Sequence, residues 1–137
     1  MPARGGSLEV AFDILAYSLQ IYYDFWAYSL MAIGLAKLFG VELPKNFDQP
    51  YLSRNPKEFW RRWHISLSSW LRDYLYIPLG GNRYGTKRRF MNLFITMVLG
   101  GLWHGAGLSY LTWGLFHGLL LVAERPFLKH LDAIGSP

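Results

Sequence analysis

The sequence of 137 residues contains no cysteine, and this absence excludes two kinds of chemistry. Without a thiol the chain forms no disulfide and offers no thiolate ligand to a metal. Charge is missing over one long stretch as well, because no Asp, Glu, Lys or Arg occurs from Phe90 to Ala123. That stretch nevertheless contains two histidines, His104 and His117, and the first lies within the glycine-rich GGLWHGAG.

The apolar residues lie in two long blocks on either side of a charged centre, whereas a small soluble domain would spread them at amphipathic spacing. This layout predicts an all-α integral membrane protein. The first block, residues 14–39, has the length of one tilted spanning helix, since about 20 residues cross the hydrocarbon. Asp24 lies within its aromatic cluster, so we expect that side of the helix to face protein.

Basic residues are concentrated between the two blocks. From Glu42 to Asn92 ten Lys or Arg stand against four Asp or Glu, a net charge of +6, whereas the whole chain carries +5. Nucleic acid is one partner that such charge suits. A short basic loop beside spanning helices, however, follows the positive-inside rule. We therefore predict that residues 42–89 form a cytoplasmic loop beside the lipid bilayer and bind no nucleic acid.

The loop contains a helix start. Asn55 suits the N-cap, Pro56 the first helical position, and Glu58 the closing position of a capping box. Beyond it, the aromatic and leucine side chains fall within about 120° of arc. This pattern predicts one amphipathic helix over 56–76, at the membrane interface or in a protein groove. His64 falls at the edge of the apolar stripe, where it is either a hydrogen-bonded structural residue or a functional residue facing the groove.

The second block, residues 90–123, is too long for one straight span, because as a single helix it would extend about 51 Å. Its glycines cluster around His104, and helix interiors tolerate such clusters poorly. We predict a broken helix pair with the break near 104–107. Non-helical backbone at membrane depth is tolerated only beside protein or a water-filled cavity, so His104 is expected to line a cavity.

A histidine in such a cavity suits general base catalysis, because burial disfavours its charged form and leaves it able to accept a proton. The alternative is a structural hydrogen bond to the broken helix. His117 is not at helical ligand spacing from His104, and the chain has no HExxH, HxH or carboxylate cluster, so no metal site is predicted. A catalytic triad also lacks a clear serine and acid partner. Base catalysis by one histidine is the simplest chemistry left.

The motifs around both histidines are long enough to compare with known families. The runs FWRRWHISLSSWLRDYLYIPLGGNR and GGLWHGAGLSYLTWGLFHGLLL closely resemble the membrane-bound O-acyltransferase family, and within it the alginate O-acetyltransferase type. The earlier YYDFWAYSLMAIGLAKLFGVELPKNFDQPYLSR is similar to the family's preceding segment. The resemblance covers Tyr22 to about Phe127 and implies that residues 1–137 are a single partial domain of this fold.

The resemblance also implies an activity: a multi-pass enzyme of the bacterial inner membrane that passes acetyl groups toward hydroxyls of an exported polysaccharide such as alginate. It implies His104, in the WHG motif, as the catalytic residue and His64, in RRWHIS, as a second functional position. No bound cofactor is implied, because acetyl-coenzyme A acts as the acyl-donor substrate. A periplasmic acetyltransferase is the implied protein partner.

Two features depart from the family pattern. In DFWAYSL, three residues (Trp26, Ala27 and Leu30) replace the small and acidic residues of the related DFSGYSD, which affects the fit of the first helix. Family members also have more spanning helices in a chain several times longer. We therefore expect a fragment, a truncated reading frame or one piece of a split enzyme.

Three other interpretations stay open from the sequence. The chain is a non-catalytic scaffold that docks a partner through its Trp-rich helix, an inactive remnant, or a small transporter segment that uses the same cavity for passage. The lack of repeated charged positions along the spans argues against the transporter. Basic residues of the loop set topology and contact anionic lipid, or they attract a phosphate-bearing donor. These residues are Arg61, Arg62 and Arg72, together with Arg83, Lys87, Arg88 and Arg89.

Overall fold

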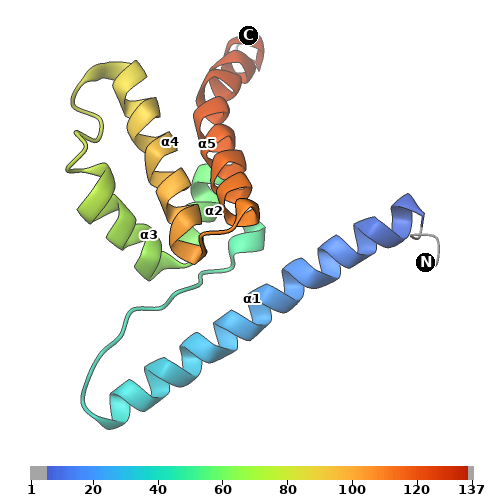
Figure 1. Cartoon of the computed structure of the whole chain (residues 1–137), viewed down its shortest axis with the longest axis vertical. Coiled ribbons are helices and arrows are strands. Elements are labelled where there is room, and N and C mark those ends of the chain that lie inside the picture. The colour runs from blue at the N-terminus through green and yellow to red at the C-terminus, as the bar shows by residue number, and fades with distance from the viewer. Residues whose placement is uncertain (1–5, 136–137) are drawn as a thin grey trace. The chain divides into compact units, whose positions relative to one another are not determined.

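The computed structural model describes residues 6–135, with side chains described as far as Glu124. Every regular element in this range is helical, as the predicted all-α class requires. The chain divides into two compact units, residues 1–47 and 48–137, and each is described by itself (Figure 1). The single domain expected over 1–137 stays a prediction.

The first unit is one long helix with a short return segment. Helix α1 covers Ser7–Leu38, and the chain leaves it through Gly40, whose φ of 73° is the left-handed conformation that favours glycine. The N–H groups of Gly40 and Val41 donate to the carbonyl oxygens of Lys37 and Ala36, which is a Schellman motif. The return segment then packs Phe47 on α1, where its ring meets Phe25 edge-on at 5.1 Å.

None of the helices within residues 6–135 unites the length and the apolar content needed to cross a bilayer. In α1, Asp24 interrupts the apolar run, and tyrosines and serines lower its hydropathy further. Among the described residues, no candidate membrane span therefore falls on the helix predicted over 14–39 or on the segment predicted over 90–123.

The second unit contains the two histidine motifs. It begins with a 3₁₀ turn, η1 (Pro50–Leu52), followed by helices α2 (Pro56–Arg62) and α3 (Ile65–Leu71) and a π-helical turn, η2 (Arg72–Tyr76). Helices α4 (Gly85–His104) and α5 (Leu108–Gly135) complete the unit. Figure 1 shows α4 and α5 running side by side as an antiparallel hairpin, and α2 contacts α5. The break between α4 and α5 falls at residues 105–107, within the range predicted from the glycines.

Glycines bring α4 and α5 into backbone contact. A Cβ atom at Gly101 would collide with the carbonyl oxygen of Tyr110, and one at Gly114 would lie 2.7 Å from the carbonyl oxygen of Met97. Gly105, in the link, has the ring of Tyr110 packed where its own side chain would be. The glycine cluster therefore does more than weaken a helix, because it lets the two helices approach closely.

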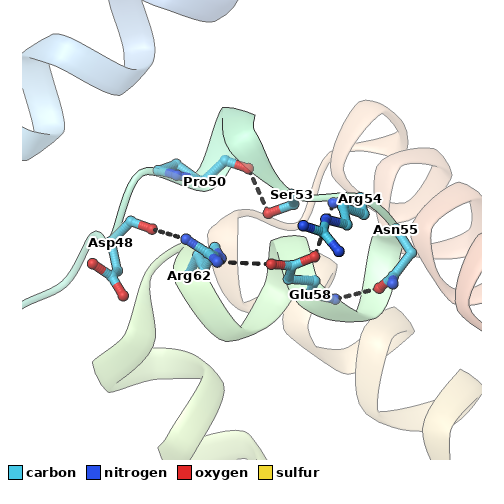
Figure 2. A network of polar contacts seen from close by, with 7 residues as sticks. All are labelled: Asp48, Pro50, Ser53, Arg54, Asn55, Glu58 and Arg62. Carbon is cyan, nitrogen blue, oxygen red and sulfur yellow. Dashed lines mark hydrogen bonds and ion pairs between the residues drawn. The ribbon is translucent and has the colours of Figure 1, made fainter.

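A polar network fixes the start of α2 (Figure 2). The Asn55 side chain accepts a hydrogen bond from the Glu58 N–H at 2.7 Å, so the predicted N-cap is confirmed. The Glu58 carboxylate accepts from the Arg54 N–H at 2.9 Å and pairs with the Arg62 guanidinium at 2.7 Å. The hydrogen bond from the Arg54 backbone N–H lowers the pKa of the Glu58 carboxyl group most, and the hydrogen bond from the Arg62 guanidinium lowers it further. Arg62 in turn donates to the carbonyl oxygen of Asp48, which ties the preceding segment to the helix.

The single amphipathic helix predicted over 56–76 is wrong. The chain leaves helical geometry at Trp63, which is extended, and at His64, whose φ of 44° and ψ of 56° are left-handed. The Ser68 N–H then donates to the His64 carbonyl oxygen at 2.9 Å and starts α3. The Trp63 ring stacks on Phe59 at 5.4 Å at the end of α2, and α3 begins at Ile65. An apolar stripe alone does not distinguish one helix from two short ones.

The backbone contact between α4 and α5 predicts a stability effect. Replacing Gly114 with Ala places a methyl group against backbone that cannot move aside, so we expect a loss of about 1–3 kcal/mol in the free energy of unfolding. The matched control is Gly34→Ala in α1, where nothing lies within 4 Å, and it should gain about 0.5–1 kcal/mol. Denaturant unfolding of the intact protein measures both. Equal stability of Gly114→Ala and the wild type would contradict the close contact.

Candidate active site

A cavity of about 670 Å³ lies within the second unit. Side chains from α2, α3, α4 and α5 line it, and they come from both histidine motifs. This volume is in the range of sites for small molecules and cofactors. The cavity is therefore large enough for a small substrate and is lined by residues of both motifs.

His64 reaches the cavity from the break between α2 and α3. A left-handed conformation is uncommon for a residue with a side chain, and such residues cluster at functional sites. Burial, assisted by the neighbouring His104, lowers the pKa of His64 from 6.5 to about 4. His64 is therefore a neutral imidazole at neutral pH.

His104 enters the same cavity as the last residue of α4. Its ring centroid lies 6.5 Å from that of His64, although the two residues are 40 positions apart in the sequence. The side chain keeps substantial exposure, and its ring also lies 5.3 Å from that of Trp113 at an interplanar angle of 77°. The structure thus brings both predicted site residues together, and their catalytic role stays a prediction.

Aromatic rings surround the histidine pair. Trp113, from α5, lines the cavity together with Trp60, from α2, and their ring centroids are 5.5 Å apart. His117 lies next to both, at 4.7 Å from Trp113 and 5.2 Å from Trp60. The sequence does not predict His117 as a site residue, because it is not at metal-ligand spacing from His104. The available signal was that Trp113 and His117, four residues apart, share one face of a helix.

Four cationic side chains line the cavity: Lys57, Arg61, Arg72 and Arg89. Arg72 is paired with Asp73 at 2.7 Å, so part of its charge is compensated. Glu124 is the acidic member of the lining, and its carboxylate accepts a hydrogen bond from the backbone N–H of Lys57 at 3.2 Å. Arg62 instead belongs to the network around Glu58.

Among the side chains that the structure describes, as far as Glu124, no group of three His, Asp or Glu residues is arranged to hold a metal ion. The residues that line the cavity offer imidazole, indole and guanidinium groups. Imidazole accepts and returns protons near neutral pH, and guanidinium binds phosphate and carboxylate groups. The arrangement suits proton transfer beside an anionic ligand.

Comparison with known proteins shows the family of the chain. Residues 10–135 match the model of the membrane-bound O-acyltransferase family. The chain is 61% identical over 111 residues to the probable alginate O-acetylase AlgI of Pseudomonas putida, covering 81% of the chain and 23% of that protein. It is 50% identical over 113 residues to the peptidoglycan O-acetyltransferase of Helicobacter pylori, covering 82% of the chain and 21% of that protein.

A more distant relative is the teichoic acid D-alanyltransferase of Streptococcus thermophilus, 38% identical over 127 residues, which covers 88% of the chain and 31% of that protein. The chain therefore spans between about a fifth and a third of the length of these relatives. The family match covers nearly the whole chain and includes both histidine motifs. The chain belongs to the membrane-bound O-acyltransferase family.

Proposed function

We propose that the chain is the histidine-bearing part of an O-acyltransferase that transfers acetyl groups to hydroxyls of an exported polysaccharide, with His104 as the catalytic base. One observation carries this proposal: His64 and His104, from two separate motifs, meet in one cavity with their ring centroids 6.5 Å apart. Members of the family are named for acyl transfer to oxygen, and a proton acceptor beside the acceptor hydroxyl is the group that such a transfer needs.

The relatives favour acetyl as the acyl group and a cell-surface polymer as the acceptor. The relatives named as alginate O-acetylases are about 60% identical to the chain, whereas those named as D-alanyltransferases are 34–38% identical. The proposed donor is acetyl-coenzyme A, a thioester that carries phosphates. The cavity-lining Lys57, Arg61 and Arg89 supply the positive charge that phosphate groups bind.

The proposed reaction is a direct transfer. The neutral imidazole of His104 accepts the proton of the acceptor hydroxyl while the hydroxyl oxygen attacks the thioester carbonyl carbon. A carbon–oxygen bond forms, the carbon–sulfur bond breaks, and the imidazolium returns its proton to the leaving thiolate. The acetyl ester and the free thiol are the products, and no covalent enzyme intermediate is needed.

His64 is the proposed second functional residue. With a pKa of about 4 it stays uncharged while His104 takes up a proton, so two positive charges do not meet across 6.5 Å. A neutral imidazole at this distance can also hold the acceptor or a bridging water by a hydrogen bond. Its left-handed backbone is the strained feature that directs the side chain into the cavity.

We further propose that the protein works at the bacterial inner membrane, as a multi-pass protein with a periplasmic acetyltransferase as partner. The family is described as membrane-bound. In α1, large apolar side chains such as Leu15 and Leu35 are 66% and 59% exposed, so they are available to lipid or to further helices.

The first prediction concerns the base. His104→Gln in the intact protein should reduce acetyl transfer from acetyl-coenzyme A to the polysaccharide by about 10²–10⁴-fold, because general base catalysis contributes that much. The control is Tyr74→Phe, at a 70% exposed side chain outside the cavity lining, which should keep wild-type activity. Radiolabelled acetyl transfer in membranes measures both. Undiminished transfer by His104→Gln would refute the assignment.

A second prediction separates the imidazole of His64 from its backbone. Glycine adopts the left-handed conformation without strain, so His64→Gly should be at least as stable as the wild type, and His64→Ala should be about 1 kcal/mol less stable than His64→Gly. Transfer should nevertheless fall in both variants. An active His64→Gly enzyme would show that the residue serves the turn alone.

A third prediction follows from the low pKa of His64. Because the unfolded chain takes up this proton near pH 6.5 and the folded chain only near pH 4, the stability that this group contributes is complete above about pH 6.5 and is lost as the pH falls toward 4. The matched variant is His64→Asn, which tolerates the same backbone and does not titrate. Its free energy of unfolding should decline less over this range than that of the wild type. Identical pH profiles would contradict the burial of His64.

A further inference from the structure

The motif GLFHG places a third histidine beside the candidate site. His117, Trp113 and Trp60 form a closed aromatic triangle, in which each ring contacts the other two. The centroid distances are 4.7 Å for His117 and Trp113, 5.2 Å for His117 and Trp60, and 5.5 Å for the two tryptophans. Two of these contacts are close to perpendicular, at 84° and 90°, which is a favoured geometry for aromatic pairs. The triangle joins α5 to α2.

The aromatic triangle touches the proposed base through one of its members. The Trp113 ring meets His104 at 5.3 Å and 77°, and Trp113 lines the cavity whereas His117 lies outside its lining. Within the described part of the chain, no side chain or backbone group forms a hydrogen bond with the His104 imidazole. Catalytic histidines are usually oriented by a hydrogen bond to a carboxylate or a carbonyl group. In this chain, ring packing by Trp113 takes the place of such a hydrogen bond at His104.

The aromatic triangle is also held by ring packing and not by hydrogen bonds of its indole groups to the described residues. The indole N–H of Trp60 is buried and has no hydrogen-bond partner within the described residues. Trp60 is therefore fixed by its neighbours' rings and by the helix that carries it. Trp113 and His117 are four residues apart on α5, so their side chains lie one above the other on one helix face. Removal of the His117 ring would leave Trp113 with space to rotate away from His104.

We propose that His117 is a positioning residue: its ring, packed on Trp60, holds Trp113 against the His104 imidazole and so fixes the direction of the proton acceptor. This inference rests on the proposed function of His104. It assigns the effect of His117 to the shape of its ring and not to its nitrogen atoms. A base that rotates away from the acceptor hydroxyl loses reactive geometry, and a misplacement of about 1 Å can cost on the order of 100-fold in rate.

Three variants of the intact protein test the proposal, with kcat and KM for acetyl-coenzyme A measured in membranes. His117→Ala should lower kcat on the order of 100-fold while KM stays unchanged, because His117 lies outside the cavity lining. Trp113→Ala removes the ring that contacts His104 and should lower kcat by a similar factor. His117→Phe keeps a ring without nitrogen and should retain kcat within about threefold of the wild type. The matched control is Trp70→Ala, which removes a 52% exposed ring that stacks on Tyr74 outside the cavity lining and should leave kcat unchanged.

Three outcomes would overturn the proposal. His117→Ala with wild-type kcat would show that the ring positions nothing. His117→Phe as inactive as His117→Ala would show that His117 acts through its nitrogen atoms. A loss of activity that follows the amount of folded protein, measured by unfolding midpoint and membrane abundance, would show a purely structural role. Wild-type transfer by His104→Gln, in contrast, would refute the proposed function itself, so the two failures are distinguishable.

Discussion

The candidate site depends on the close approach of α4 and α5. Gly101 and Gly114 put the backbones of the two helices in contact, and α5 returns along α4 immediately after the break at His104. A close antiparallel hairpin brings Trp113, on the second turn of α5, back against the last residue of α4. With side chains at the glycine positions the helices would separate, and Trp113 would lose its contact with His104.

Both proposed site histidines lie where a helix is interrupted. His64 stands between α2 and α3 in a left-handed conformation, and His104 is the last residue of α4 before an extended glycine. Residues inside a regular helix project at fixed angles, whereas a break allows a side chain to take a direction that the helix would not give it. Hydrogen bonds compensate the first interruption. The Ser68 hydroxyl donates to the Trp63 carbonyl oxygen, and the Ser68 backbone N–H donates to the His64 carbonyl oxygen. The polar network around Glu58 anchors the helix that leads into it.

Local features of the site could be predicted from the sequence, and tertiary ones could not. The N-cap at Asn55 and the break beside His104 follow from residues with strong local preferences, namely the Asn-Pro pair and the glycine cluster. The interruption at His64 has no such local signal, since left-handed backbone is uncommon for any residue other than glycine and the apolar stripe continues past His64. The place of His117 depends on Trp60, 57 positions earlier, so only the folded chain reveals it.

The proposed function requires that the acyl donor binds in the cavity lined by His64 and His104. An experimental structure of the intact protein with a non-reactive thioether analogue of acetyl-coenzyme A tests it most directly. We expect the acyl group between the two imidazoles, with the His104 ring facing the position of the acceptor hydroxyl and the phosphates near Lys57, Arg61 or Arg89. An acyl group bound away from both histidines would refute the proposed site.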